Sequence, residues 1–196
     1  EGLKLRIVSG TSNRGPWVEA LYGPYIERRL GELLSDCTVG AVVEQNGAAD
    51  RRGRSDRAIQ LAIGQPTSVR RRPDGKPEIR GETEVSAAHA GDLTLAVAGR
   101  GPLSCDLEYV ESRSGAVWQD LLGTERIALA QVVVRETGED QNAAATRVWA
   151  ASECLKKAGI ALDAPLTLGV STSDGWVLLA AGPLVTATFV ARVRGA

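Results

Sequence analysis

The chain has 196 residues, of which 43% are hydrophobic and 24% charged, and its formal net charge is −1. This composition is typical of a globular protein with one larger domain or two small ones that share a core. A net charge so close to zero argues against a nucleic acid or an anionic membrane as the partner. No apolar run in the sequence reaches the length of a transmembrane helix.

The cysteine and methionine usage bears on the cellular context. The three cysteines, Cys37, Cys105 and Cys154, form no CxxC pair, which argues against a disulfide framework and a zinc site. Reduced thiols of the cytoplasm fit this pattern best, and no signal-peptide pattern is present. Methionine is absent even at position 1, so we interpret the chain as a piece of a longer polypeptide or a trimmed one.

The first 36 residues have their own pattern. Residues 3–9 alternate as a strand does, and residues 15–34 carry a helical apolar pattern that two Gly-Pro pairs interrupt. We assign 1–36 as a leader segment that either belongs to the domain or continues an upstream region.

From residue 37 onward the predicted elements repeat. Residues 38–64 predict an apolar strand, a polar loop and a helix, and residues 126–159 predict the same order. A three-strand signal follows each, at 83–110 and 166–193, with Gly-Asp or Asp-Gly turns. The sequence therefore predicts an α+β fold of two similar halves, 37–101 and 102–196. Pseudo-twofold symmetry would relate them, with the cleft between them as the expected ligand site.

Two carboxylates stand out in the segment 103–109, whose alternating apolar residues predict a strand. Asp106 and Glu108 would then lie together on one face, where two carboxylates can share a hard cation such as magnesium. The alternative is a half-exposed strand with solvated acids.

Several basic groups are candidates for phosphate binding. Arginines cluster at 50–57 and 69–76, the turn at 74–78 presents Lys76, and the single histidine, His89, precedes a Gly-Asp turn. Each has a plain alternative: a solvated loop for the clusters, an ordinary turn for Lys76 and a structural imidazole for His89.

The segment 147–159 predicts a helix with a glycine stop at Gly159. Trp149, Glu153 and Lys157 are spaced four apart and share one face. The alternative is an ordinary Glu153–Lys157 pair beside a tryptophan of the core.

Read in order, these motifs form a set. A Gly-Lys-Pro turn is followed by a Ser-x-x-His strand end, an Asp-x-Glu strand and a Trp-x-x-x-Glu-x-x-x-Lys helix. This order resembles the Sfp-type 4'-phosphopantetheinyl transferases over about 51–159, and the repeated halves resemble that family's architecture. The resemblance implies an enzyme that uses magnesium to transfer 4'-phosphopantetheine from coenzyme A to a serine of an acyl carrier protein. The products would be the holo-carrier and 3',5'-ADP.

The family's site residues map onto matching positions. By this resemblance, Asp106, Glu108 and Glu153 bind magnesium, Glu153 is also a candidate base, and Lys157 contacts the coenzyme A pyrophosphate. The remaining coenzyme A contacts would be Lys76, His89, the looser match Ser86, and Arg51 and Arg52 at the 3'-phosphate, with Arg54 or Arg57 as further candidates.

Three positions depart from the family pattern. Ala88 replaces the serine before His89, Ser152 replaces a lysine before Glu153, and Cys105 replaces a glycine before Asp106. None of these changes removes a metal ligand. The change at Ser152 removes a charge that the family has near its site.

A carrier protein needs a docking surface, and the family uses apolar residues beside the cleft. Trp118, Leu121 and Leu122 are the candidates, with an ordinary core role as the alternative. The absent methionine and the leader predict a domain that is part of a longer chain. In this the protein resembles the transferase domain at the C-terminal end of enediyne-type polyketide synthases. The rival interpretations are a catalytically impaired carrier-docking module and a hot-dog dehydratase or thioesterase.

Overall fold

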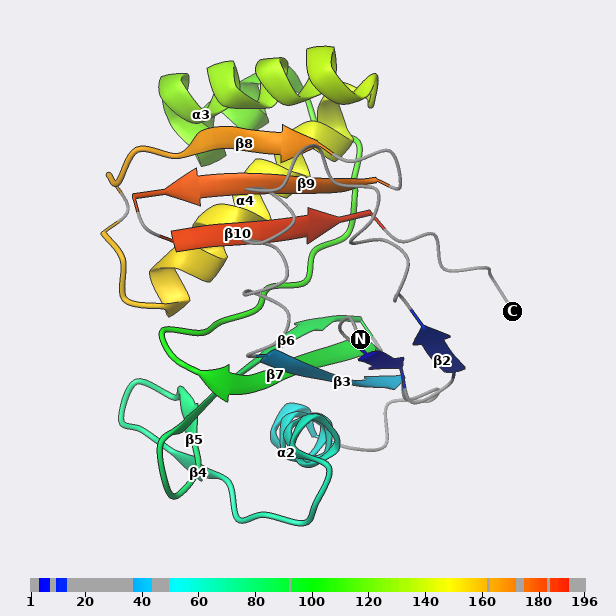
Figure 1. Cartoon of the computed structure of the whole chain (residues 1–196). Coiled ribbons are helices and arrows are strands. Elements are labelled where there is room, and N and C mark those ends of the chain that lie inside the picture. Colours follow the sequence, from blue (N-terminus) through cyan, green and yellow to red (C-terminus); the bar gives the residue numbers. More distant parts are fainter. Residues whose placement is uncertain are drawn as a thin grey trace. The chain divides into compact units, whose positions relative to one another are not determined.

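The computed structural model of the chain describes residues 4–7, 10–13, 37–43, 50–91, 93–161, 163–171, 175–182 and 184–190 (Figure 1). The described residues form two compact units, of which the first ends at Glu108 and the second begins at Tyr109. Both units combine helices with mainly antiparallel strands, so the fold is α+β, as predicted. The predicted leader helix at 15–34 lies outside the described residues.

A five-stranded sheet and one helix make up most of the first unit. The sheet order is β2-β1-β3-β7-β6, with β1 and β3 parallel and the other pairs antiparallel. Helix α2 (Arg51–Ile63) packs against β3, β6 and β7 (Figure 1). The strands are β1 (Lys4–Ile7), β2 (Gly10–Asn13), β3 (Cys37–Val43), β6 (Thr83–Ala90) and β7 (Leu93–Arg100).

Helix α2 is defined by its caps and by one apolar stripe. The Asp50 side chain accepts a hydrogen bond from the Gly53 N–H at the amino end, and Gly64 ends the helix with φ of 80°. Ala58, Ile59 and Ala62 are buried, and Ala62 lies four residues after Ala58 and three after Ile59, so the three share one helix face. This face packs on Val85 and Ala96 of the sheet, together with Ala98.

A short hairpin follows α2. Strands β4 (Arg70–Arg71) and β5 (Pro77–Glu78) pair antiparallel. The Gly75 N–H donates to the Arg72 carbonyl at 2.8 Å, and Gly75 has φ of 87°, which favours glycine. The turn predicted at 74–78 is confirmed at Asp74 and Gly75, whereas Pro77 and Glu78 form β5.

Two helices and a three-stranded antiparallel sheet form the second unit. The strand order is β10-β9-β8, and the helices cover one face of this sheet (Figure 1). Helix α3 packs against α4 and β8, and α4 packs against β10. The elements are α3 (Gly115–Thr137), α4 (Gln141–Lys157), β8 (Thr167–Ser171), β9 (Trp176–Ala181) and β10 (Leu184–Phe189).

The strand predicted at the start of 126–159 is wrong, because these residues continue helix α3 to Thr137. The run of valines at 132–134 favoured a strand. In the structure Leu129, Ala130 and Val133 are buried at helical spacing in the part of α3 that follows a kink at Gly123, and they belong to the core of the second unit. Tertiary packing on that stripe outweighs the small preference of valine for strands.

The strand predicted at 103–109 is also wrong, since residues 103–114 contain neither strand nor helix. The Cys105 N–H donates to the Ser86 hydroxyl at 3.3 Å, so a side chain occupies a group that a strand ladder would use. Cys105 is buried, whereas Tyr109, predicted on the same apolar face, is 58% exposed. The three strands predicted at 166–193 are confirmed as β8, β9 and β10.

Candidate functional site

The amino end of α2 concentrates positive charge. Four arginines lie in its first two turns, and no acidic residue lies in the first turn. Arg51 and Arg52 are exposed there. The amino end of a helix already carries a partial positive charge, which the Asp50 carboxylate at the N-cap partly offsets and the arginines increase, so the exposed guanidinium groups suit an anion. The arginines predicted to bind the 3'-phosphate therefore lie on a helix terminus rather than on a solvated loop.

His89, near the end of β6, links the sheet to α2. Its Nε2 lies 2.9 Å from Ser55 Oγ, and its Nδ1 lies 2.8 Å from Thr94 Oγ1. The Ser55 hydroxyl donates its only proton to the Arg51 carbonyl oxygen at 3.0 Å. Nε2 therefore carries a proton that it donates to Ser55, and Nδ1 pairs with the Thr94 hydroxyl.

Arg54 makes a second link at the same end of the sheet. Its Nη1 donates to the Gly91 carbonyl oxygen at 2.9 Å, in the turn between β6 and β7. Its Nε is buried and has no hydrogen-bond partner among the described residues. The structure thus gathers Arg51, Arg54 and His89, all predicted phosphate ligands, around one helix terminus.

Lys76 lies at the other end of β6. Its Nζ is 3.4 Å from Glu84 Oε2, near the start of the strand that carries His89. Glu84 and His89 are five residues apart, which is about 17 Å along a strand. The sequence placed Lys76 and His89 in one phosphate-binding set, and within the first unit they occupy opposite ends of that strand.

Ser86 has a structural role within the first unit. Its side chain is buried, and its hydroxyl accepts the hydrogen bond from the Cys105 N–H. The Cys105 thiol donates in turn to the Leu95 carbonyl oxygen at 3.7 Å. Ser86 therefore holds the extended segment immediately before Asp106, and the coenzyme A contact predicted for it stays a prediction.

The predicted magnesium ligands come from both units. Asp106, half-buried, and Glu108, exposed, end the first unit, and Glu153 lies on α4 of the second. Within either unit's described residues taken alone, no three His, Cys, Asp or Glu side chains form a metal-binding group. All three predicted ligands are carboxylates, which is the donor type that magnesium prefers.

Helix α4 confirms the predicted helix at 147–159 and its glycine stop. Asp140 caps its amino end. At its carboxyl end the Gly159 N–H donates to Lys156 O at 3.0 Å and the Ile160 N–H donates to Leu155 O at 2.9 Å. With φ of 84° at Gly159, these two bonds form a Schellman motif.

The side chains predicted to share one face of α4, Trp149, Glu153 and Lys157, differ in their contacts. Trp149 packs against the core of the second unit. Glu153 is half-buried and makes an ion pair with Lys156, three residues on, at 3.5 Å. Lys157 is half-buried on the last turn. Ser152, where the family has lysine, is buried and donates to the Val148 carbonyl oxygen at 2.7 Å.

The predicted docking residues are largely interior. Trp118 is 2% exposed and Leu122 is 5% exposed, and both belong to the core of the second unit, against which Leu121 packs. Trp118 Nε1 donates to Asn142 Oδ1 at 2.9 Å, which fixes the start of α3 to α4. The docking prediction for Trp118 and Leu122 is therefore corrected to the core role, because their side chains are not available to a partner.

Neither a protein-family model nor a curated protein sequence matches the chain. In the described part of the chain, no helix combines the length and apolar character needed to cross a membrane.

Proposed function

We propose that the chain is an Sfp-type 4'-phosphopantetheinyl transferase. It would transfer 4'-phosphopantetheine from coenzyme A to a serine of an acyl carrier protein and release 3',5'-ADP. The order of motifs from Gly75 to Lys157 is the basis of the resemblance. The proposal includes two related halves with the ligand in the cleft between them. It also includes the setting of an integrated, cytoplasmic domain of an enediyne-type polyketide synthase.

One observation carries the proposal: the side chains of Arg54 and His89 meet the end of the β6–β7 hairpin and α2 at the helix terminus where exposed Arg51 lies. These residues come from a helix and a distant strand end, and sequence order alone does not require them to meet. Guanidinium groups at a helix amino terminus are well suited to a phosphate dianion. In the proposal this cluster binds the 3'-phosphate of coenzyme A.

The carboxylates supply the metal site of the proposal. Asp106 and Glu108 of the first unit would hold magnesium together with Glu153 of α4, so the active form requires the two units to bring these side chains together. Ser86 supports this arrangement, because it anchors the residue before Asp106 to the sheet. Magnesium, when bound, would neutralise charge on the pyrophosphate oxygens.

The reaction is a displacement at phosphorus. The carrier serine oxygen forms a bond to the β-phosphorus of coenzyme A, and the bond from that phosphorus to the oxygen of 3',5'-ADP breaks. Glu153 takes the serine proton, directly or through a water molecule. Lys157 stabilises the negative charge that develops on the leaving 3',5'-ADP, and catalysis rests mostly on positioning and charge neutralisation.

The test is intact mass spectrometry of an apo carrier protein incubated with the chain, coenzyme A and magnesium. We expect a gain of one phosphopantetheine that EDTA prevents. No gain with several carriers, together with retained binding of coenzyme A, would point instead to an impaired docking module. Absence of both transfer and coenzyme A binding would overturn the proposal.

Two variants address the carboxylates directly. Glu153→Ala and Asp106→Ala should each lower transfer by about 10²–10⁴-fold, as loss of a positioned acid or base does, while the circular dichroism spectrum is unchanged. Asp120→Ala and Glu82→Ala are the matched controls, because both carboxylates are exposed and lie outside the proposed site. Near-normal turnover in either site variant would remove the core of the mechanism.

A further inference from the structure

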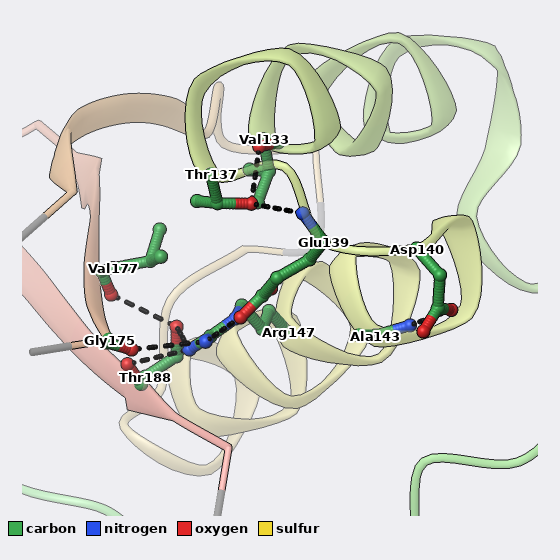
Figure 2. Close-up of polar contacts among 9 residues, drawn as sticks. All are labelled: Val133, Thr137, Glu139, Asp140, Ala143, Arg147, Gly175, Val177 and Thr188. Atoms are coloured by element: carbon green, nitrogen blue, oxygen red, sulfur yellow. Dashed lines mark hydrogen bonds and ion pairs between the residues drawn. The ribbon is translucent and has the colours of Figure 1, made fainter. Parts of the chain in front are cut away.

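A buried arginine that the transferase proposal does not use lies near the start of α4. Arg147 is 3% exposed, and Figure 2 shows its guanidinium group facing the ends of two strands. Nε donates to Glu139 Oε2 at 2.8 Å, and Nη2 donates to Glu139 Oε1 and to Gly175 O at 3.0 Å. Nη1 donates to Thr188 O at 2.9 Å and to Thr188 Oγ1 at 3.2 Å. All five N–H donors of the side chain are thereby satisfied.

The partners of Arg147 are themselves fixed. The Thr188 hydroxyl donates to the Val177 carbonyl oxygen at 3.0 Å, which ties β10 to β9. The Glu139 N–H donates to Thr137 Oγ1 at 3.1 Å, at the end of α3 (Figure 2). One side chain therefore joins α4 to the α3–α4 connection and to both strands, and a shift of α4 would break several bonds at once.

Helix α4 depends on such an anchoring contact because many side chains on its buried face are small. Four of the buried residues of α4 are alanines, namely Ala143, Ala144, Ala145 and Ala151, and Val148 and Leu155 are the larger apolar ones. Small side chains interdigitate little, so apolar packing alone defines the rotation and translation of the helix weakly. Directional bonds to a buried charge specify position better than they add stability.

We propose that Arg147, held by Glu139, sets the register of α4 and so positions Glu153 and Lys157. Glu153 lies six residues beyond Arg147, about 9 Å along a continuous helix, so a displacement at Arg147 is transmitted to it. The catalytic consequence rests on the proposed function, whereas the anchoring itself does not. Arg147 is a positioning residue, because it acts through the helix and not on the substrate.

The test compares two variants with a matched control. Arg147→Lys keeps the charge but offers one ammonium in place of a planar five-donor group, so it cannot reach Glu139 and both strands together. Thr188→Val is milder, because it removes one acceptor and keeps the backbone carbonyl. Arg135→Lys makes the same chemical change at an exposed arginine of α3.

Two readouts are measured at a temperature where all the proteins are folded. In hydrogen–deuterium exchange, we expect amides of 141–157 to exchange faster in Arg147→Lys while those of the first unit keep their wild-type rates. In the transfer assay, we expect kcat to fall about tenfold or more, because small displacements of catalytic groups are costly. KM for coenzyme A should change less, because Arg51 and His89 lie on the other unit. Thr188→Val should shift both readouts in the same direction by a smaller factor.

Uniform acceleration of exchange across the chain, or kcat equal to that of Arg135→Lys, would reduce Arg147 to a general contributor to stability and overturn the inference. If the wild-type chain transfers nothing to any carrier, the proposed function fails. The exchange pattern still decides the anchoring in that case: acceleration confined to α4 supports it, and uniform acceleration overturns it. If Arg147→Lys does not fold, Thr188→Val decides by the same criteria.

Discussion

Each unit uses a polar side chain to join its helix to its sheet, and the two choices differ. In the first unit, half-buried His89 on β6 bonds Ser55 of α2 and Thr94 of β7. In the second, fully buried Arg147 on α4 bonds Glu139 and the ends of β9 and β10. One link runs through hydroxyl groups, and the other is an ion pair.

The two links differ in how easily their hydrogen bonds can be exchanged for bonds to a ligand. The hydroxyls around His89 can reorganise when an anion arrives, because each neutral hydrogen bond contributes only about 0.5–1.5 kcal/mol. Arg147 has a buried charge whose desolvation is offset only while its partners remain in place. We therefore expect the α2 end of the first unit to respond to ligand and the α4 anchor to stay rigid.

The largest expected effect comes from neutralising the partner of Arg147. Glu139→Gln keeps the shape but removes the counter-charge, so the free energy of unfolding of the second unit should fall by about 3 kcal/mol. This is the low end for a buried pair, because Glu139 is itself 25% exposed. Urea unfolding followed by tryptophan fluorescence measures it, since Trp118, Trp149 and Trp176 all lie in this unit.

Glu136→Gln is the control for that measurement, because Glu136 is an exposed glutamate on the neighbouring helix α3. Equal unfolding midpoints for Glu139→Gln and Glu136→Gln would mean that the charge of the pair is unimportant. The contrast between the two units would then be one of geometry alone.

The hydroxyl link of the first unit should be less sensitive. Thr94→Val removes the hydroxyl beside His89 Nδ1 at a fully buried position, and we expect a loss of about 1–3 kcal/mol. Hydrogen exchange of α2 and β6 amides reports it, with exposed Thr83→Val as the control. In a double-mutant cycle with His89→Ala the losses should be less than additive. Full additivity would contradict the hydrogen bond between these side chains.

Ser86→Ala tests how the first unit presents its carboxylates. Loss of the acceptor for the Cys105 N–H should loosen the segment before Asp106. The magnesium concentration for half-maximal transfer should rise about tenfold or more, as loss of an outer-shell partner does. KM for coenzyme A should stay close to the wild-type value. The reverse pattern, a raised KM for coenzyme A with unchanged magnesium dependence, would identify Ser86 as a direct coenzyme A contact. Ser68→Ala, which changes an exposed serine, is the control.

The smallest effect is expected at the partly exposed Lys76–Glu84 pair. Glu84→Gln should change the free energy of unfolding by less than about 1 kcal/mol, because solvent screens this pair. Coenzyme A should bind somewhat more tightly, since Lys76 loses a competing carboxylate. Calorimetric titration compares Glu84→Gln with Glu82→Gln, which makes the same charge change at an exposed neighbour. Equal affinities in the two variants would exclude Lys76 from the phosphate site.

Local chemistry determined several elements directly from the sequence. The helix ending at Gly159, the turn at Gly75 and the strands β8 to β10 each follow from residues close together in the chain. A left-handed glycine after a helical pattern ends that helix in almost any surroundings. The α+β class follows from the same signals, because it depends on the kinds of element and not on their partners.

Tertiary contacts determined the conformation of segments whose local sequence did not favour one structure clearly. Valines at 132–134 adopt a helix because the stripe of Leu129, Ala130 and Val133 packs in the core of the second unit. Residues 103–109 form no strand, and the Cys105 N–H donates to the Ser86 hydroxyl instead of to a strand partner. The burial of Trp118 and the five bonds of Arg147 depend on groups far away in the sequence. The residue type determines which bonds a side chain can make. The partners for those bonds are brought close only when the chain folds.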